Sequence, residues 1–268
     1  MVTRGLPGSQ GISNGTEVRA RILGVECDLV DYEQALRAID AWRQKGERHY
    51  VALVNPHSIM VCRRDTSLRA AMAGAGLSLP DGVGLILAAR LLGLKSRGRV
   101  TGPTLMLKLC DWGRERGYRH YFYGGKEGVA ETLARRLSER FPGLEVAGTF
   151  SPPFRTLTEE EGAAVVEKIN ATRPDVVWVG LGAPKQEKWM AAHVGRIAAA
   201  ALIGVGAAFD FHSGNVKWAP GWIRKIGMEW AWRLAHEPRR LWRRNLDSPL
   251  FLLAVMKQRI MMTFSHRR

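Results

Sequence analysis

Short apolar runs alternate along this chain with longer stretches in which apolar residues recur every three or four positions. The runs predict buried strands, and the longer stretches predict amphipathic helices. Strands are expected at 18–25, 50–54, 77–80, 120–123, 144–150, 175–179 and 200–205. Helices are expected at 32–44, from 57, from 83, and at 103–116, 129–141, 158–172 and 185–194. The helix from residue 83 carries an apolar stripe of Val83, Ile86, Leu87 and Leu91.

Most of these runs are apolar throughout instead of alternating with polar residues, which is typical of strands covered on both faces. The repeated order of strand, loop and helix predicts an α/β fold. We therefore expect a Rossmann-like, mainly parallel sheet with helices on both faces.

The two ends of the chain depart from this pattern and divide it into three parts. Residues 1–17 are rich in Gly, Ser and Asn and are expected to form a flexible lead-in, which leaves 18–214 as the Rossmann-like domain. Residues 215–268 hold twelve Lys or Arg against three acidic residues, and five of the nine tryptophans. This composition predicts a basic, Trp-rich helical C-terminal appendage.

The formal net charge of +15 calls for an anionic partner, which could be nucleic acid, anionic lipid or a phosphorylated substrate. Tryptophan beside arginine is typical of helices that lie in a membrane interface. Arginine also suits the phosphates of nucleic acids. Composition alone leaves lipid and nucleic acid equally open.

The cysteines and the apolar segments bear on the compartment. Cys27, Cys62 and Cys110 show no CxxC spacing, so we expect buried free thiols in a reducing compartment. The N-terminus lacks the apolar core of a signal peptide, and no window reaches the ~18–20 apolar residues of a spanning helix. We expect a cytoplasmic protein whose membrane contact is peripheral.

Asp81 is the first candidate catalytic residue, because it lies where a buried strand ends and a helix begins. Ligands of open α/β sheets bind at strand ends, and Gly82 allows close backbone approach there. A carboxylate in this place is a candidate general base. The alternative is that Asp81 only caps the following helix. The loop beyond that helix carries Arg99 and Thr101.

Two glycine-rich loops follow predicted strands. The loop 124–128 reads GGxxG, not GxGxxG, so it is a weak dinucleotide signal and an ordinary sharp turn. In 180–187, Gly182 clears space at a strand end, while Lys185 and Gln186 place a cation and an amide at a helix start that favours phosphate. The alternative for 180–187 is a plain turn and a solvated helix start.

Asp210 is a second carboxylate near a strand end. It could accept a hydrogen bond from a ribose hydroxyl or from uracil, or it could cap a helix. His57 and His212 also lie beside strand ends, but the chain has no HExxH or DxD motif. We predict no metal site.

Ordered segments from residue 18 to about residue 244 carry a family resemblance. They are VNP at 54–56, PDGVG at 80–84, RVTG at 99–102, FYGG at 122–125, SPPF at 151–154, GLGAPKQE at 180–187, GVGAAFD at 204–210 and GMEW through EPRR at 227–240. With these segments the chain resembles the WecG/TagA/CpsF glycosyltransferases, glycosyltransferase family 26.

The resemblance implies a GT-E-like fold and a catalytic role for the domain at 18–214. It implies a membrane-associated, inverting enzyme that needs no metal or other cofactor. Such an enzyme moves a sugar from a UDP donor to a sugar joined by diphosphate to a polyprenol. The reaction would take place at the cytoplasmic face of the membrane, in the synthesis of a bacterial surface polysaccharide or teichoic acid. Oligomeric state is left open, with a homo-oligomer as one possibility.

The resemblance also implies roles for individual residues. Asp81, as the base that deprotonates the acceptor hydroxyl, and Arg99 are assigned to catalysis. The acceptor site is assigned to Asn55, Thr101, Arg233, Arg240 and Arg243, of which the three arginines would close over the site and hold diphosphate. The donor site is assigned to Gly124, Gly125, Gly182, Lys185, Gln186, Glu187 and Asp210.

Two positions depart from the family pattern. Leu53 stands where the family often has Thr, and Trp218 stands where it usually has Arg. The first departure bears on the donor, which could be UDP-ManNAc or a related hexose or uronic acid such as UDP-glucose. Two other functions fit parts of the sequence, namely a nucleotide-cofactor oxidoreductase and a non-catalytic nucleic-acid-binding protein.

Overall fold

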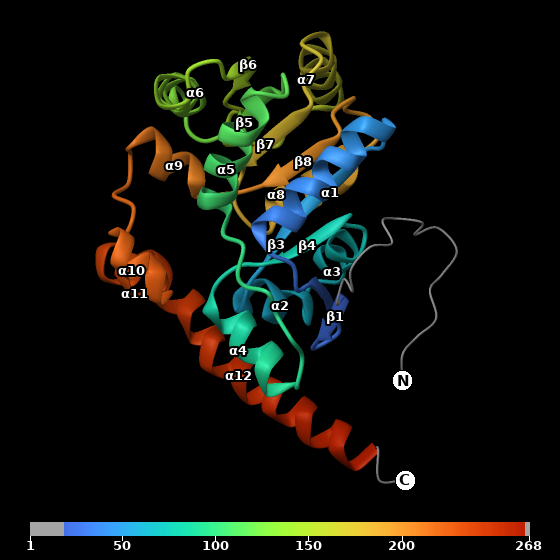
Figure 1. The fold of residues 1–268 in the computed structure, drawn as a ribbon, viewed down its shortest axis with the longest axis vertical. Helices are drawn as coiled ribbons and strands as arrows, with labels where there is room; N and C mark the ends of the chain where they lie inside the picture. Colours follow the sequence, from blue (N-terminus) through green and yellow to red (C-terminus); the bar gives the residue numbers. More distant parts are fainter. Residues whose placement is uncertain (1–18, 266–268) are drawn as a thin grey trace.

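A computed structural model describes residues 19–265, apart from the side chains of residues 240, 243, 244 and 265. The predicted lead-in at 1–17 lies outside these residues. Six strands form one sheet in the order β4-β3-β8-β7-β5-β6, and every neighbouring pair is parallel (Figure 1). The strands are β3 (His49–Val54), β4 (Leu77–Pro80), β5 (Arg119–Gly124), β6 (Glu145–Phe150), β7 (Val176–Gly180) and β8 (Ala201–Gly204). The predicted α/β fold is confirmed.

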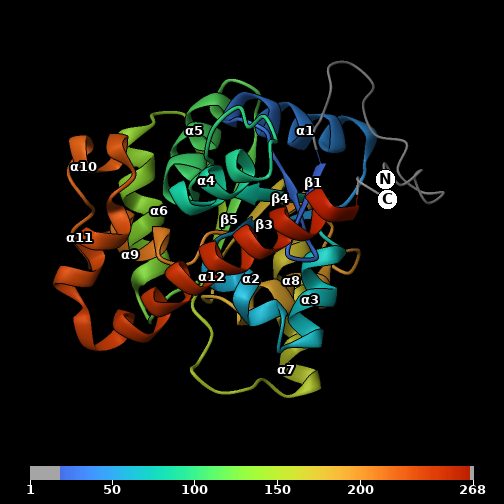
Figure 2. The ribbon, with the colours of Figure 1, turned by 90° about the horizontal axis from the view of Figure 1, so that it is seen from below.

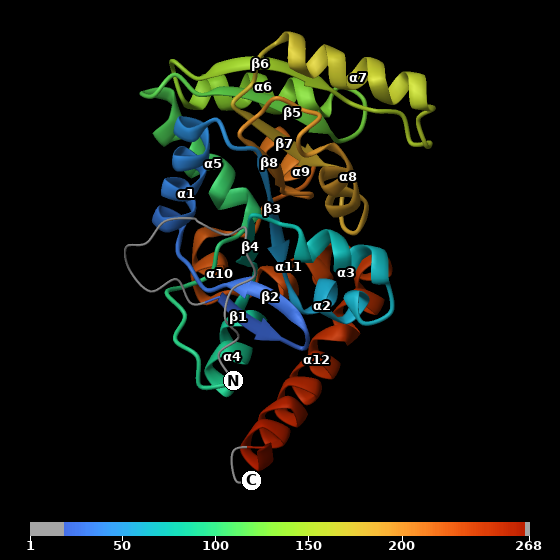
Figure 3. The ribbon, with the colours of Figure 1, turned by 90° about the vertical axis from the view of Figure 1, so that its right-hand side faces the viewer.

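Helices cover both faces of the sheet, as the uniformly apolar strands predicted. In β3, Val51 and Leu53 pack into one hydrophobic core, while Ala52 and Val54 pack into the other. The first core includes α1 (Tyr32–Lys45), α5 (Gly102–Arg114), α6 (Val129–Arg140) and α9 (Ala208–Ser213). The second includes α2 (Pro56–Cys62), α3 (Thr66–Ala73), α7 (Glu159–Ala171) and α8 (Lys185–His193). Figure 3 shows α1 and α5 on one side of the sheet and α3 and α8 on the other.

The N-terminal strand prediction needs a correction. In place of one strand over 18–25, the chain forms an antiparallel hairpin of β1 (Arg19–Ile22) and β2 (Val25–Asp28). The turn consists of Leu23 and Gly24, whose φ angles of 49° and 86° are left-handed and end the extended run.

The region after residue 215 is helical, as predicted. It contains α10 (Gly221–Ile226), α11 (Glu229–His236) and α12 (Pro238–Ser265), and Figures 1 and 2 show α12 running beneath α2 and α4. Phe251 and Val255 of α12 are fully buried in the core that also holds α2. The division of the chain at residue 215 into domain and appendage stays a prediction.

Helix α4 (Val83–Leu91) does not bury its predicted apolar stripe in the core. Its buried residues are Leu85, Ala88 and Ala89, whereas Leu87 is 45% exposed. The residues of α4 itself are apolar on nearly every face of the helix. Periodicity alone therefore could not identify the face that packs into the core.

Candidate active site

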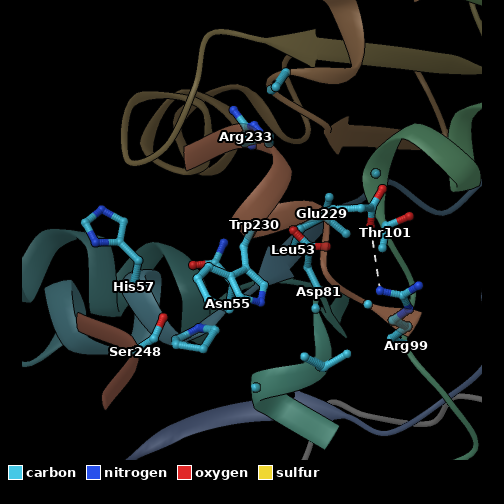
Figure 4. A pocket seen from close by; sticks show the side chains of 18 of the residues that line it. Leu53, Asn55, His57, Asp81, Arg99, Thr101, Glu229, Trp230, Arg233 and Ser248 are labelled. Carbon is cyan, nitrogen blue, oxygen red and sulfur yellow. Dashed lines mark ion pairs between the residues drawn. The ribbon is translucent and has the colours of Figure 1, made fainter. Parts of the chain in front are cut away.

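A cavity of about 1080 Å³ lies at the carboxyl ends of β3, β4, β7 and β8 (Figure 4). This is the edge at which open α/β sheets bind ligands. The opposite wall consists of helices α4, α11 and α12, so the cavity lies between the sheet edge and the C-terminal helices.

Asp81 and Asn55 lie side by side at the sheet edge. Val54 and Pro80 are paired in the β3–β4 register, and the backbone N–H of Asp81 donates to the carbonyl of Val54 at 2.7 Å. The next residue of each strand therefore leaves the sheet at the same level, and both side chains line the cavity. Two residues 26 positions apart in sequence are thus fixed as neighbours by backbone hydrogen bonds.

Asn55 also begins α2. Its Oδ1 accepts from the N–H of Ser58 at 3.0 Å, and the Ser58 hydroxyl lies 2.9 Å from the backbone N–H of Asn55, which completes a capping box. Because capping occupies Oδ1, the side-chain NH₂ is the group available to a ligand in the cavity.

Asp81 is not the N-cap of α4. That position is taken by Gly82, whose φ of 91° suits glycine and which has no side chain to cap with. The capping alternative for Asp81 is therefore not what the structure shows. The carboxylate lies between Asn55 and Arg99 in Figure 4.

Arg99 reaches the cavity from the loop that follows α4. The loop is held against the sheet because the N–H of Val100 donates to the carbonyl of Pro80 at 2.8 Å. The guanidinium of Arg99 lies 3.6 Å from the carboxylate of Glu229 in α11 and also donates to the carbonyl of Arg224. Arg99 thus joins the sheet edge to the C-terminal helices.

Thr101 lines the same wall but is already hydrogen-bonded within the protein. Its hydroxyl lies 3.2 Å from the hydroxyl of Tyr32, and its side chain is buried. Gly102 follows, and a Cβ there would lie 2.7 Å from Leu53 Cδ1. Glycine therefore allows the start of α5 to rest directly on β3, where Leu53 forms part of the cavity wall.

Gln186 and Glu187 close the side of the cavity near β7 and β8, together with Gly182. Both side chains are at most 4% exposed, and Gln186 Nε2 donates to Glu187 Oε1 at 3.0 Å. Within the described part of the chain, the buried Oε1 of Gln186 has no hydrogen-bond partner. A buried amide oxygen without a partner is costly, so a ligand donor is expected to satisfy it.

The predicted arginines of the C-terminal region differ in what the structure describes. Arg233 of α11 lines the cavity, with its guanidinium 5.4 Å from the ring centroid of Phe211. Arg240 and Arg243 lie in the first turns of α12, but their side chains are outside the described residues. Their role in holding diphosphate stays a prediction.

Four predicted donor residues are not part of the cavity wall: Gly124, Gly125, Lys185 and Asp210. The glycines have a packing reason, because a Cβ on Gly124 would lie 2.6 Å from the backbone of Gly180 and one on Gly125 would lie 2.8 Å from Val129. Lys185 is exposed, and Asp210 lies in α9, whose neighbouring residues Ala208 and Phe211 do line the cavity.

The sequence analysis missed two residues of the C-terminal helices, Glu229 and Asp247. The carboxylate of Glu229 pairs with Arg99 and also accepts a hydrogen bond from Trp218 Nε1 at 3.1 Å. Trp218 therefore orients Glu229, and Glu229 in turn orients Arg99. Asp247 of α12 lies 2.6 Å from Nδ1 of His57, which lines the cavity. The GMEW segment at 227–230 was a signal for Glu229, whereas nothing local marks Asp247.

The junction between α10 and α11 fits tightly against α4. Gly227 has a φ of 79°, and a Cβ there would overlap Val83 Cγ1 and lie 3.1 Å from Arg99 Nη1. Only glycine at this position lets α11 approach the cavity without displacing α4 or Arg99.

His212 is half-buried beside the cavity wall, and its Nε2 donates to the carbonyl of Pro103 at 2.9 Å. Burial, with the nearby positive charges of Arg140 and Arg224, lowers the pKa of His212 to about 4. The imidazole is therefore neutral near pH 7. Among residues 19–265, no group of three or more His, Cys, Asp or Glu side chains could hold a metal ion.

The structure also bears on the cysteine and membrane expectations. Cys27, Cys62 and Cys110 are buried free thiols, as predicted. Burial raises the pKa of the Cys62 thiol to about 11, so it is protonated near pH 7. No helix in the described part of the chain is both long enough and apolar enough to cross a membrane.

The chain is similar to proteins of known family. The model of the glycosyl transferase WecG/TagA/CpsF family matches residues 20–264. A relative from Bacillus spizizenii is 32% identical over 234 residues, covering 87% of this chain and 88% of the relative. A relative from Bacillus subtilis (strain 168) is 30% identical over 220 residues, covering 79% of this chain and 84% of the relative. A relative from Staphylococcus aureus (strain MW2) is 25% identical over 238 residues, covering 88% of this chain and 91% of the relative. All three are named N-acetylglucosaminyldiphosphoundecaprenol N-acetyl-beta-D-mannosaminyltransferase. This chain therefore belongs to the WecG/TagA/CpsF family of glycosyltransferases.

Proposed function

We propose that this glycosyltransferase moves a sugar from a UDP-sugar to a hydroxyl of a sugar that is linked through diphosphate to a polyprenol. The observation that carries the proposal is the pairing of Asp81 with Asn55 at the sheet edge, in one cavity with Arg99 and Arg233. The names of the relatives support this substrate class, because their acceptor is a sugar on diphosphoundecaprenol.

Asp81 acts as the general base in this proposal. Its carboxylate takes the proton of the acceptor hydroxyl while the oxygen attacks the anomeric carbon of the donor sugar. The bond between that carbon and the UDP oxygen breaks from the opposite face, so the anomeric configuration inverts. The NH₂ of Asn55, left available by capping, can orient the acceptor hydroxyls beside the base.

The leaving UDP carries the electron pair of the broken bond and needs positive charge near its diphosphate. Arg99 and Arg233 line the cavity and can donate to phosphate oxygens in bidentate geometry. Metal independence is part of the proposal, because these arginines can supply the charge.

The donor is proposed as UDP-ManNAc, by analogy with the names of the relatives, or as a related hexose or uronic acid such as UDP-glucose. Leu53 bears on this choice because it lines the cavity directly beside the start of α5. A leucine offers no hydrogen bond to a sugar hydroxyl, so the donor is held by other groups at this point.

The exposed apolar side chains support a peripheral attachment to the membrane, which we propose to be at its cytoplasmic face. Among the described residues, every large exposed apolar side chain except Phe154 belongs to α4 or to residues 222–264. Basic residues of the same region can contact anionic lipid head groups. The acceptor, also in the membrane, would then lie close to the cavity.

The proposal is tested with a panel of UDP-sugars and a GlcNAc-diphosphate-lipid acceptor, using wild type, Asp81→Asn and Asp111→Asn in parallel. Asp111 is an exposed carboxylate on α5 that serves as a matched control. We expect one donor to react with inversion, and Asp81→Asn to lower kcat about 100-fold or more while unfolding and UDP binding stay unchanged.

Turnover by Asp81→Asn at the wild-type rate would refute the general-base assignment. Retention of anomeric configuration would refute direct displacement. The absence of product from every donor, in a protein that binds UDP, would refute this acceptor class.

A further inference from the structure

The cavity has a polar part and an apolar part. Its total volume is about 1080 Å³. The polar residues Asn55, Asp81, Arg99 and Gln186 lie at the sheet edge. The remaining part extends between α4 and α12 and is lined mainly by apolar side chains, among them Ile86, Leu87, Trp242, Leu246, Phe251 and Leu252. We call this part the α4–α12 groove.

The groove is continuous with the polar site. Asp81 and Gly82 lead directly into Val83 and the first turn of α4, and all of them line the same cavity. Trp230 of α11 also lines the cavity and lies beside Asn55 in Figure 4. A ligand bound at Asp81 can therefore extend into the groove without leaving the cavity.

The groove is also continuous with the exposed apolar surface. Leu87 and Leu246 line it and are 45% and 54% exposed, and α12 continues with the exposed side chains of Leu253 and Met256. One end of the groove is thus polar and enclosed by the sheet, and the other opens where apolar side chains reach solvent. A ligand suited to both ends is amphipathic.

Contacts on both sides fix the positions of the helices that form the groove. Phe251 is fully buried beneath it, and His57 holds Asp247 at 2.6 Å, which fixes α12 against α2. Near the end of α4, Arg259 Nη1 lies 3.4 Å from the carbonyl of Leu92. The groove is therefore preformed, and a ligand does not need to separate the helices.

The apolar lining of the groove favours binding of a hydrocarbon chain. Burying a polar sugar or base against Ile86, Leu246 and Leu252 would leave its hydrogen-bonding groups without partners, which is unfavourable. Burying apolar surface there is favourable. We propose that the α4–α12 groove binds the first isoprene units of the acceptor lipid, next to its diphosphate. This inference rests on the proposed function, since it names a subsite for the same acceptor.

The test compares two water-soluble acceptors with the same GlcNAc-diphosphate head, one carrying a methyl group and one a farnesyl group. No membrane or detergent is present, so membrane attachment cannot favour the longer acceptor. We expect the farnesyl acceptor to have a KM about tenfold or more below that of the methyl acceptor, because several isoprene units are removed from water.

Two leucines of α12 provide a matched pair of variants. Leu246 lines the groove and is 54% exposed, whereas Leu250, four residues on, is 50% exposed and is not part of the cavity wall. Leu246→Asp is expected to raise the KM for the farnesyl acceptor about tenfold and to leave the methyl acceptor unchanged. Leu250→Asp is expected to change neither.

Equilibrium binding of farnesyl diphosphate and methyl diphosphate to the full chain separates this inference from the proposed function. Suppose that neither acceptor reacts, that farnesyl diphosphate binds more tightly than methyl diphosphate, and that Leu246→Asp weakens farnesyl diphosphate binding. The groove inference would then hold while the proposed function fails. Equal KM and Kd values for the two chain lengths would overturn the inference. Equal effects of Leu246→Asp and Leu250→Asp, or a dimer that Leu246→Asp dissociates, would also overturn it.

Discussion

The two walls of the cavity are built in different ways. On the sheet wall, Asp81 and the loop bearing Arg99 are fixed by backbone hydrogen bonds to Val54 and Pro80. On the helical wall, α4 and α12 are anchored in the core by residues such as Leu85 and Phe251, whereas no residue of α11 is buried and its contacts include side-chain pairs such as Glu229 with Arg99. The comparison teaches that Asp81, the proposed base, lies on the wall that the backbone fixes. On the other wall, α11 is the helix without buried residues, so its displacement would break few buried contacts.

The substitution expected to change stability most is at Phe251, the buried residue that anchors α12 of the helical wall. Phe251→Ala should lower the free energy of unfolding by about 3–5 kcal/mol, because it leaves a cavity in the core shared with α2. Leu253→Ala, at a position 63% exposed, should change it by less than about 0.5 kcal/mol. Urea unfolding measures both. A loss below about 1 kcal/mol for Phe251→Ala would mean that α12 is not anchored by this packing.

The second effect concerns the interior of the sheet, away from the cavity. His120 of β5 is fully buried, Trp178 Nε1 donates to its Nδ1 at 3.1 Å, and burial lowers the pKa of His120 to about 4. Above pH 6.5 the imidazole is neutral in both folded and unfolded chains. Between pH 6.5 and pH 4 the unfolded chain binds a proton that the folded chain does not, so stability falls as the pH falls.

For the same reason His120→Gln should lose less stability than wild type between pH 7 and pH 5. The expected difference is on the order of 1–2 kcal/mol, measured by urea unfolding at both pH values. The glutamine amide oxygen can still accept from Trp178. Identical pH dependence in the two proteins would show that His120 does not contribute.

The smallest effect tests the link between the walls. Arg99 and Glu229 have side chains about 21% and 20% exposed and lie 3.6 Å apart. A double-mutant cycle with Arg99→Ala and Glu229→Ala should give a coupling of about 1 kcal/mol in unfolding free energy. Trp218→Phe, which removes the donor to Glu229, should reduce that coupling. Strict additivity would mean that the two walls are energetically independent.

Local sequence patterns predicted most of the sheet and its helices. The strands with the apolar runs 50–54 and 176–179 were recognisable because burial on both faces of the sheet favours apolar residues at every position. The neighbourhood of Asp81 and Asn55 was partly predictable, since both follow strands whose ends meet at one sheet edge. Strand order could not be predicted, because it depends on contacts between segments far apart in sequence.

The helical wall shows the limit most clearly. His57 and Asp247 are 190 residues apart and meet only because α12 packs back on α2. Gly124 and Gly125 lie at a strand end, as a phosphate loop would, yet Gly124 allows the close approach of β5 to β7 and Gly125 allows close packing against Val129 of α6. A glycine required by packing and one required by a ligand give the same sequence signal, and only the three-dimensional neighbours separate them.

Gly227 sets how closely α11 can approach α4. Its missing side chain is what lets the start of α11 rest on Val83 and beside Arg99. A single added methyl group at this position would act as a wedge between α11 and α4. Gly227→Ala would thus displace α11 relative to α4 and disturb the position of Arg99, so this glycine sets the spacing between the two helices.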